Sequence, residues 1–283
     1  MRLFQTLLIS FPFFVLLNSC NYRKAYYFSP FNGNVPAYHT TPLQIDSIET
    51  ATYGGVLFGA GAANDELQDN IFIIKPTIYR SYSRENCQFY YGGNFTLGNY
   101  YVKKYDNIRS SSLFGTTRDY LNANLINEQS GNKFFGGLGL NAGVNYTIPF
   151  RRRHEWRIGT ESSYQHEWGD YLQFRRRLHD TAATVIHRQR HFVTLGLYSE
   201  LAFKLRNGSI GFKIGIGTPL GKNYRSLDRA GYDDDLFSFA YLSPAFQYTN
   251  DRWTGFVQLN LATKAFHGQL GTSYRLTSNL KTR

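Results

Sequence analysis

The sequence KFFGGLGLNAGVNYTIPF, residues 133–150, decides the fold because its side chains change character at every second position. The even positions are mainly apolar, and the odd positions are mainly glycine and amide: Phe134, Leu138, Leu140, Ala142, Val144, Tyr146 and Ile148 alternate with Gly137, Gly139, Asn141, Gly143, Asn145 and Thr147. Successive side chains of a strand point to opposite faces. The stretch therefore predicts a strand whose two faces meet two different solvents.

Residues 193–205, VTLGLYSELAFKL, repeat this pattern and add charge to the second face. A transmembrane β-strand needs about 9–11 residues, apolar toward lipid and polar toward a lumen, and both segments reach that length. We therefore predict an all-β fold, an antiparallel transmembrane β-barrel. A soluble antiparallel sandwich, extractable without detergent, shares the alternation and stays open as an alternative.

The composition favours the barrel. Phe, Trp and Tyr make up 17% of the chain, 26 residues are Gly, and the mean hydropathy is −0.39. Past residue 20 the chain has no apolar run of about 20 residues, which a spanning helix requires. In a transmembrane barrel only half of each strand faces lipid, and aromatic girdles mark both interfaces.

The formal net charge is +11, and the charged residues fall mainly in turns, loops and the polar faces of strands. This distribution favours outer-membrane lipid headgroups or a basic lumen as partners over nucleic acid. The sequence contains no recognition motif for DNA or RNA.

Residues 1–19 have the form of an export signal, with Arg2 before the apolar block Leu3–Leu17. The motif Leu17-Asn18-Ser19-Cys20 resembles the lipobox of bacterial lipoproteins, although Asn18 departs from the small or aliphatic residue usual there. The resemblance implies that Cys20 becomes the acylated N-terminus and carries palmitate. The only other cysteine, Cys87, then has no disulfide partner within the chain.

Residues 20–48 form a leader rich in proline and aromatic residues, with no strand or helix pattern. The run Phe28-Ser-Pro-Phe, Val35-Pro-Ala-Tyr and Thr41-Pro-Leu resembles the leader that follows the lipidated cysteine in a group of lipid-anchored bacterial outer-membrane barrels. The resemblance implies a barrel lipoprotein of unassigned role with no catalytic residues. The leader is expected to tether the first strand, to cap the barrel or to enter it.

Residues 49–283 are expected to form the barrel from about ten strands, with eight or twelve as alternatives. The expected strands are 51–61, 71–83, 88–105, 133–150, 155–175, 185–205, 210–223, 236–249, 253–263 and 267–277. Connections after the even-numbered strands are short, those after the odd-numbered strands are mostly longer, and the longest gap is 106–132. Outer-membrane barrels have short periplasmic turns and longer outer loops. We therefore expect a long outer loop at 106–132, both termini in the periplasm of a Gram-negative bacterium, and a lipid anchor in the periplasmic leaflet.

If the apolar faces point outward, seven charged side chains point into the lumen: Lys75, Arg157, Glu161, Glu167, Glu200, Lys204 and Lys213. A barrel of eight to ten strands is just wide enough for side chains or one small ligand. Pairing between opposite charges lowers the cost of placing them in a narrow interior. The charges predict a polar packed lumen, with a conducting pore or ligand path as the alternative.

A basic cluster is expected at an outer loop: Arg175, Arg176, Arg177, Arg188 and Arg190. Guanidinium groups bind phosphate bidentately, so the cluster suggests contact with lipopolysaccharide, and solvated loop charge is the alternative. We expect no metal and no cofactor. His187 and His191 would lie roughly 13 Å apart along a strand, and residues 233–235, three aspartates, lack the spacing of an EF-hand loop.

Three functions remain from the sequence. The first is a non-enzymatic barrel lipoprotein that serves as a structural or accessory subunit of an outer-membrane protein assembly, with the leader and the long loop as docking surfaces. The second is a small pore or ligand carrier. The third is an outer-membrane lipid hydrolase, because Ser162 and His166 fall on the outward face; the sequence offers no orienting third residue, so we do not expect an enzyme.

Overall fold

The computed structural model describes residues 25–31, 48–64, 69–104, 123–151, 154–179, 182–183, 185–220, 241–262 and 265–280. Ten long strands make up the barrel: β2 (Ile48–Ala63), β3 (Asp69–Arg84), β4 (Cys87–Val102), β5 (Gly131–Arg151), β6 (His154–Trp168), β8 (His191–Leu205), β9 (Gly208–Leu220), β10 (Tyr241–Asn250), β11 (Trp253–Ala262) and β12 (Ala265–Leu280). Four short elements accompany them: β1 (Tyr26–Tyr27), β7 (Val185–Ile186), α2 (Ala123–Asn127) and α3 (Asp170–Arg177).

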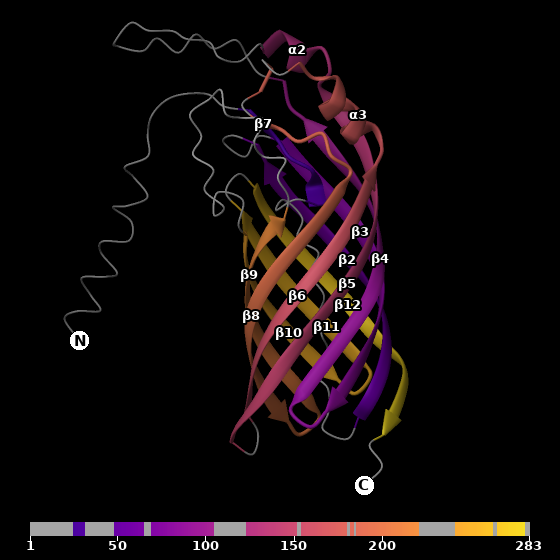
Figure 1. Cartoon of the computed structure of the whole chain (residues 1–283), viewed down its shortest axis with the longest axis vertical. Helices are drawn as coiled ribbons and strands as arrows, with labels where there is room; N and C mark the ends of the chain where they lie inside the picture. Colours follow the sequence, from indigo (N-terminus) through magenta and orange to yellow (C-terminus); the bar gives the residue numbers. More distant parts are fainter. Residues whose placement is uncertain are drawn as a thin grey trace, which may run out of the picture.

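The ten long strands form one closed antiparallel barrel in the order β10-β11-β12-β2-β3-β4-β5-β6-β8-β9, with β9 paired to β10 (Figure 1). The first strand after the leader, β2, pairs with the last strand of the chain, β12, and this pairing closes the sheet. The predicted fold class and the count of ten strands are confirmed. The sandwich that the sequence left open as an alternative is excluded, because a single sheet closes on itself.

Among the described residues, the two largest differences from the predicted strand boundaries lie in the connection between β6 and β8. The strand expected to continue to residue 175 ends at Trp168, where Gly169 (φ 115°) starts α3. The strand expected from residue 185 begins at His191, after the two-residue strand β7. Gly169 carries a backbone conformation that residues with a Cβ rarely adopt, so the chain turns there instead of extending the strand.

The residues that alternate in the sequence face alternately outward and inward in the barrel. Along β8 the exposed residues are His191, Val193, Leu195, Leu197, Ser199, Leu201, Phe203 and Leu205, and the residues between them face inward. The outer wall is strongly apolar: Leu140 is 65% exposed and Leu197 is 64% exposed. Soluble monomers rarely expose a contiguous apolar surface of this extent, and such a surface marks a contact with lipid or with another protein.

Prolines interrupt the ladder only locally. Pro76 on β3 keeps its pairing toward β2 but falls in a gap of the pairing toward β4. Pro244 on β10 pairs toward β9 and falls in a gap toward β11. Pro149 lies beside the register shift near the end of β5. Proline has no N–H to donate, so each lies where the ladder can lose one bond.

The two ends of the barrel differ. The described short turns at 85–86, 206–207 and 251–252 lie at the same end as the start of β2 and the end of β12. The helices α2 and α3 and the strands β1 and β7 lie at the opposite end (Figure 1). We call this opposite end the mouth. Among the described residues, no helix is both long and apolar enough to cross a bilayer.

Lysine substitutions on the outer face of β8 test whether that face contacts hydrocarbon. Leu197 lies at the middle of the strand and Leu205 at its end, and both are exposed on the same face. In lipid vesicles we expect Leu197→Lys to lower the free energy of unfolding by about 2–4 kcal/mol and Leu205→Lys by at most about 1 kcal/mol. Denaturant titration measures both. Equal costs at the two positions would contradict a hydrocarbon-facing wall.

Candidate functional site: a filled lumen and a capped mouth

The structure places all seven sequence-predicted lumen charges on inward-facing positions of the barrel wall: Lys75, Arg157, Glu161, Glu167, Glu200, Lys204 and Lys213. Six of them form ion pairs with other described residues. Lys75, which is 1% exposed, has no ion pair among the described residues. The charges therefore lie mainly on the wall formed by β6, β8 and β9, with Lys75 apart from them on β3.

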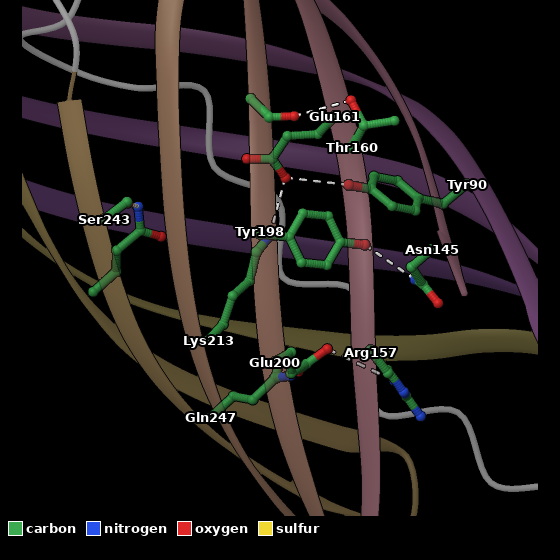
Figure 2. Close-up of polar contacts among 12 residues, drawn as sticks. Tyr90, Asn145, Arg157, Thr160, Glu161, Tyr198, Glu200, Lys213, Ser243 and Gln247 are labelled. Atoms are coloured by element: carbon green, nitrogen blue, oxygen red, sulfur yellow. Dashed lines mark hydrogen bonds and ion pairs between the residues drawn. The ribbon is translucent and has the colours of Figure 1, made fainter. Parts of the chain in front are cut away.

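Glu161 is at the centre of the first network (Figure 2). Its carboxylate accepts a hydrogen bond from the hydroxyl of Tyr90 at 3.2 Å and pairs with the Nζ of Lys213 at 2.9 Å. The same Nζ lies 3.8 Å from the centroid of the Tyr198 ring, and the Tyr198 hydroxyl accepts from the Nδ2 of Asn145 at 3.1 Å. Residues from five neighbouring strands, β4, β5, β6, β8 and β9, thus meet inside the lumen, and the cation has both a carboxylate and an aromatic face as partners.

A second network lies toward the short-turn end of the lumen. Arg157 pairs with Glu155 at 3.0 Å and approaches Glu200 at 3.9 Å. Glu155 also pairs with Lys204, and Glu200 accepts a hydrogen bond from the side chain of Gln247. Each acid is therefore shared between neighbours, which offsets the cost of placing these charges in a narrow interior.

The wall formed by β10, β11 and β12 is lined by neutral polar side chains. Ser243, Gln258 and Asn260 form a connected hydrogen-bonded group, and Thr249 bonds to Thr254. The amide groups of Asn141 and Gln165, on the opposite side, have no hydrogen-bond partner among the described residues. Buried amides without protein partners normally bind water. The interior is therefore crowded but suited to hold water between the side chains.

The mouth is closed by residues 25–31, which we call the cap segment. Every residue of the segment is buried. Within it, β1 pairs in parallel with β7, and the backbone N–H of Tyr26 donates to Asn64 at 2.7 Å. The Phe31 ring packs edge-on against Phe135 with 5.9 Å between centroids. Gly137 lies against the Phe31 ring: a Cβ at this position would be only 2.3 Å from the ring.

A buried ion pair fastens the cap segment to the barrel. The Ser29 hydroxyl donates to Glu167 at 2.5 Å, and Glu167 pairs with Arg175 of α3. Both charged side chains have 0% exposure. Arg175 also donates to the backbone carbonyl of His187. Burial and the nearby charge of Arg175 lower the pKa of His187 to about 3, so this imidazole is neutral near pH 7.

Stacked aromatic rings join α3 to the barrel rim. The Tyr171 ring stacks on Tyr100 with 3.9 Å between centroids, and the Tyr171 hydroxyl donates to the carbonyl of Phe28. The Tyr100 hydroxyl donates to Asp69 at 3.0 Å, and Asp69 also accepts from the side chain of Asn64. The cap segment, α3 and the rims of β2, β3 and β4 are therefore one connected unit.

The predicted basic cluster does not act as one group. Arg175 lies inside the mouth on Glu167, so it cannot reach an external phosphate; this corrects its predicted role. Arg176 and Arg177 are exposed on α3, and the Nε of Arg176 donates to the carbonyl of Arg188. Adjacent helical residues point about 100° apart, so a run of three arginines cannot share one face. Arg190 is exposed beside β8.

Several residues of the site were not identified from the sequence. Glu155 falls at a strand boundary, where the alternation gives no clear face. Tyr90 and Tyr198 fall on inward positions, but tyrosine is equally expected in the aromatic girdles at the membrane interfaces. Ser29 contacts Glu167 across 138 positions of the chain, and no local pattern signals such a contact. Cys20, residues 233–235 and most of the gap 106–132 lie outside the described residues. Cys87 is an exposed free thiol, and no group of three metal-ligating side chains occurs in the part of the chain that the structure describes.

The chain matches no protein-family model and no curated protein. Solved structures similar to it are outer-membrane barrels. Neisserial surface protein A aligns with a TM-score of 0.32 and 9% identity over 80% of this chain and 97% of its own. An outer membrane channel from Pseudomonas putida F1 aligns with a TM-score of 0.41 and 8% identity over 85% and 100%. The transport unit of the autotransporter AIDA-I from Escherichia coli aligns with a TM-score of 0.41 and 9% identity over 86% and 94%. We draw no functional conclusion from likenesses at this level.

If the pair between Glu167 and Arg175 fastens the cap segment, then Glu167→Gln should loosen it. The substitution leaves a buried guanidinium without its counter-charge, which costs about 3–5 kcal/mol. We expect amide hydrogen exchange at Tyr26 and His187 to become faster by roughly a hundredfold or more. The control is Glu128→Gln, the same change at an exposed position near α2, which should leave both rates unchanged. Unchanged exchange in Glu167→Gln would show that other contacts hold the segment.

Proposed function

We propose that this protein is an outer-membrane barrel with a closed lumen that serves as a structural or accessory subunit of a membrane assembly. The observation that carries the proposal is the closure of the interior. Ion-paired side chains project into the lumen from the wall formed by β6, β8 and β9, and the buried cap segment lies in the mouth. An open path would require both to be rearranged, so a role in conduction is not the simplest use of this geometry.

The outer wall supports placement in the outer membrane. In hydrocarbon every backbone N–H and C=O must be bonded within the protein, and among sheets only a closed barrel satisfies this. Here the barrel is closed, its outer face is apolar, and its polar side chains face inward. The export signal predicted at residues 1–19 and the short turns at one end fit the same location.

We also propose that Cys20 carries the lipid anchor and that the anchor enters the leaflet around the mouth. Ala25 of the cap segment lies five positions after Cys20, and an extended chain of that length reaches at most about 18 Å. The apolar core of a bilayer is about 30 Å thick. If the long connections face outward, the anchor lies in the outer leaflet, and not in the periplasmic leaflet that the sequence suggested.

Palmitate labelling and surface labelling test the anchor together. We expect Cys20→Ala to lose incorporated palmitate. An epitope inserted in residues 105–122 should be detected on intact cells, whereas one at the 206–207 turn should need permeabilised cells. Labelling that persists in Cys20→Ala would end the lipidation proposal. Detection of the 206–207 epitope on intact cells would place the mouth, and with it the anchor, on the periplasmic side.

A small pore or ligand carrier is the second candidate, and one observation favours it. The described residues provide no ion pair for Lys75 and no protein partner for the amide of Asn141. Removal of the cap segment would leave an interior with a cation that lacks a fixed counter-charge. Such an interior favours anions. A protein that works in this way would need a trigger that moves the cap segment.

The third candidate, a lipid hydrolase, has less support. Ser162 and His166 both face outward on β6, but Tyr164 lies between them on the same face. Positions four apart on a strand are separated by roughly 13 Å, too far for the hydroxyl to transfer a proton to the imidazole. The contacts of His166 are with His191 and Trp168. We therefore propose a non-enzymatic role.

Purification in mild detergent and bilayer recording separate the first two candidates. For an accessory subunit we expect at least one protein partner at stoichiometric amount and no stable conductance steps from the purified barrel. As a matched test, a variant without residues 25–31 should show small anion-selective steps. Stable steps from the intact chain, with no copurifying partner, would favour the pore and overturn the accessory role.

A further inference from the structure

A groove of about 690 Å³ crosses the outer wall of the barrel over the neighbouring strands β3, β4, β5 and β6. Its lining is almost entirely apolar and includes Pro76, Ile78, Gly93, Phe95, Leu138 and Leu140. Paired residues on adjacent strands line it: Ile78 opposes Gly93, and Phe95 opposes Leu138. The groove therefore follows the hydrogen-bonding direction of the sheet. Its volume lies in the range of sites that hold a small ligand.

The groove exists because an outward position of β4 has no side chain. Gly93 lies between Tyr91 and Phe95 on the outward face, and both of these rings are exposed. A Cβ at Gly93 would have ordinary contacts, with its nearest neighbour at 3.5 Å. The backbone conformation and the packing therefore do not require glycine here. The missing side chain leaves room on a wall that is otherwise covered by large apolar side chains.

One end of the groove carries polar groups. Tyr164 and His166 line it on β6, and His166 is paired across the ladder with His191 of β8. The Nδ1 atoms of the two imidazoles are 3.2 Å apart, and the Tyr164 hydroxyl lies 2.7 Å from Nδ1 of His191. A hydroxyl and two imidazoles, which can donate hydrogen bonds, therefore meet where the apolar lining ends.

This polar end lies at the level where lipid headgroups are expected. Trp168, the last residue of β6, has its ring 6.2 Å from that of His166 and 6.0 Å from that of Phe95. Tryptophan favours the interface between hydrocarbon and headgroups. Arg190 is exposed directly before His191, and its backbone carbonyl accepts from the N–H of Glu167 at 2.7 Å. The backbone of Arg190 is thus held against β6, next to the imidazole pair in the chain.

We propose that this groove binds one acyl chain of lipid A, with a lipid A phosphate held by Arg190, His166 and His191. The inference rests on the proposed outer-membrane location, with the mouth on the outer side. Charge complementarity supports the choice of occupant, because His166 lines the end of the groove, His191 contacts it, and the exposed Arg190 precedes His191; imidazole and guanidinium groups are donors suited to phosphate. A hydrophobic peptide segment has no phosphate to place against these donors.

The Gly93 position gives a direct test. The protein is purified from outer membranes in mild detergent, and bound lipid is identified by native mass spectrometry. We expect wild type to retain lipid A and Gly93→Leu, which fills the groove, to retain at least tenfold less. The matched control is Gly255→Leu: Gly255 is also outward and exposed, a Cβ there meets nothing within 4 Å, and it lies on β11, away from the groove. This control should retain lipid A like wild type.

A second variant tests the headgroup contacts. Arg190→Gln combined with His166→Gln leaves the groove open and removes two of the proposed phosphate donors. Purified barrels are exchanged against micelles that contain lipid A or phosphatidylglycerol in equal amount. We expect wild type to prefer lipid A by about tenfold and the double variant to lose that preference. Equal binding of phosphatidylglycerol by wild type, or equal lipid A retention by Gly93→Leu and wild type, would overturn the inference.

Failure of the proposed location gives a different result from failure of the groove. Each variant is checked for extraction and for the heat-dependent gel mobility of a folded barrel. A barrel that extracts without detergent would contradict the outer-membrane proposal itself. A membrane-embedded, folded barrel that carries no lipid A would leave that proposal in place and contradict only the groove.

Discussion

The structure depends on one constraint: no backbone N–H or C=O on the barrel wall can be left without a partner if the wall lies in hydrocarbon. The pairing of β2 with β12 and of β9 with β10 meets this constraint by leaving no free edge. The alternation of apolar and polar residues along each strand then follows, since each strand has one face outside the barrel and one inside. The barrel tolerates a missing backbone hydrogen bond only locally: Pro76 and Pro244 each lie in a gap of the pairing toward one neighbouring strand and stay paired toward the other.

The same closure determines the interior. Ten strands enclose a space that side chains largely fill, so charges placed there must pair or bind water. On one wall Glu161, Lys213, Arg157 and Glu200 share partners, and on the other wall amides and hydroxyls bond to one another. The mouth follows the same rule, since the buried Glu167 and Arg175 are compensated by each other and by Ser29. A filled interior and a fastened cap segment are therefore parts of one arrangement.

The sequence predicts what is local and periodic. The alternation in residues 133–150 and 193–205 was sufficient to indicate the fold, and the same pattern along the rest of the chain predicted the strand count and the inward positions of the seven lumen charges. It could not predict α3, because the charged run after Trp168 resembles a continuing strand, and so Arg175 was assigned to an outer surface. The contact of Ser29 with Glu167 joins distant parts of the chain and leaves no periodic signal. The groove at Gly93 depends on four strands that become neighbours only when the barrel forms.

Spin labels placed one at a time at positions 193–201 of β8, in lipid bilayers, test the central claim most directly. Collision rates with oxygen, which concentrates in hydrocarbon, and with a water-soluble nickel complex report the surroundings of each position. The account predicts high oxygen collision at positions 193, 195, 197 and 201, and low oxygen collision at 194, 196, 198 and 200. Low accessibility to both reagents at the odd positions would mean that the apolar face is covered by protein, and would contradict the account.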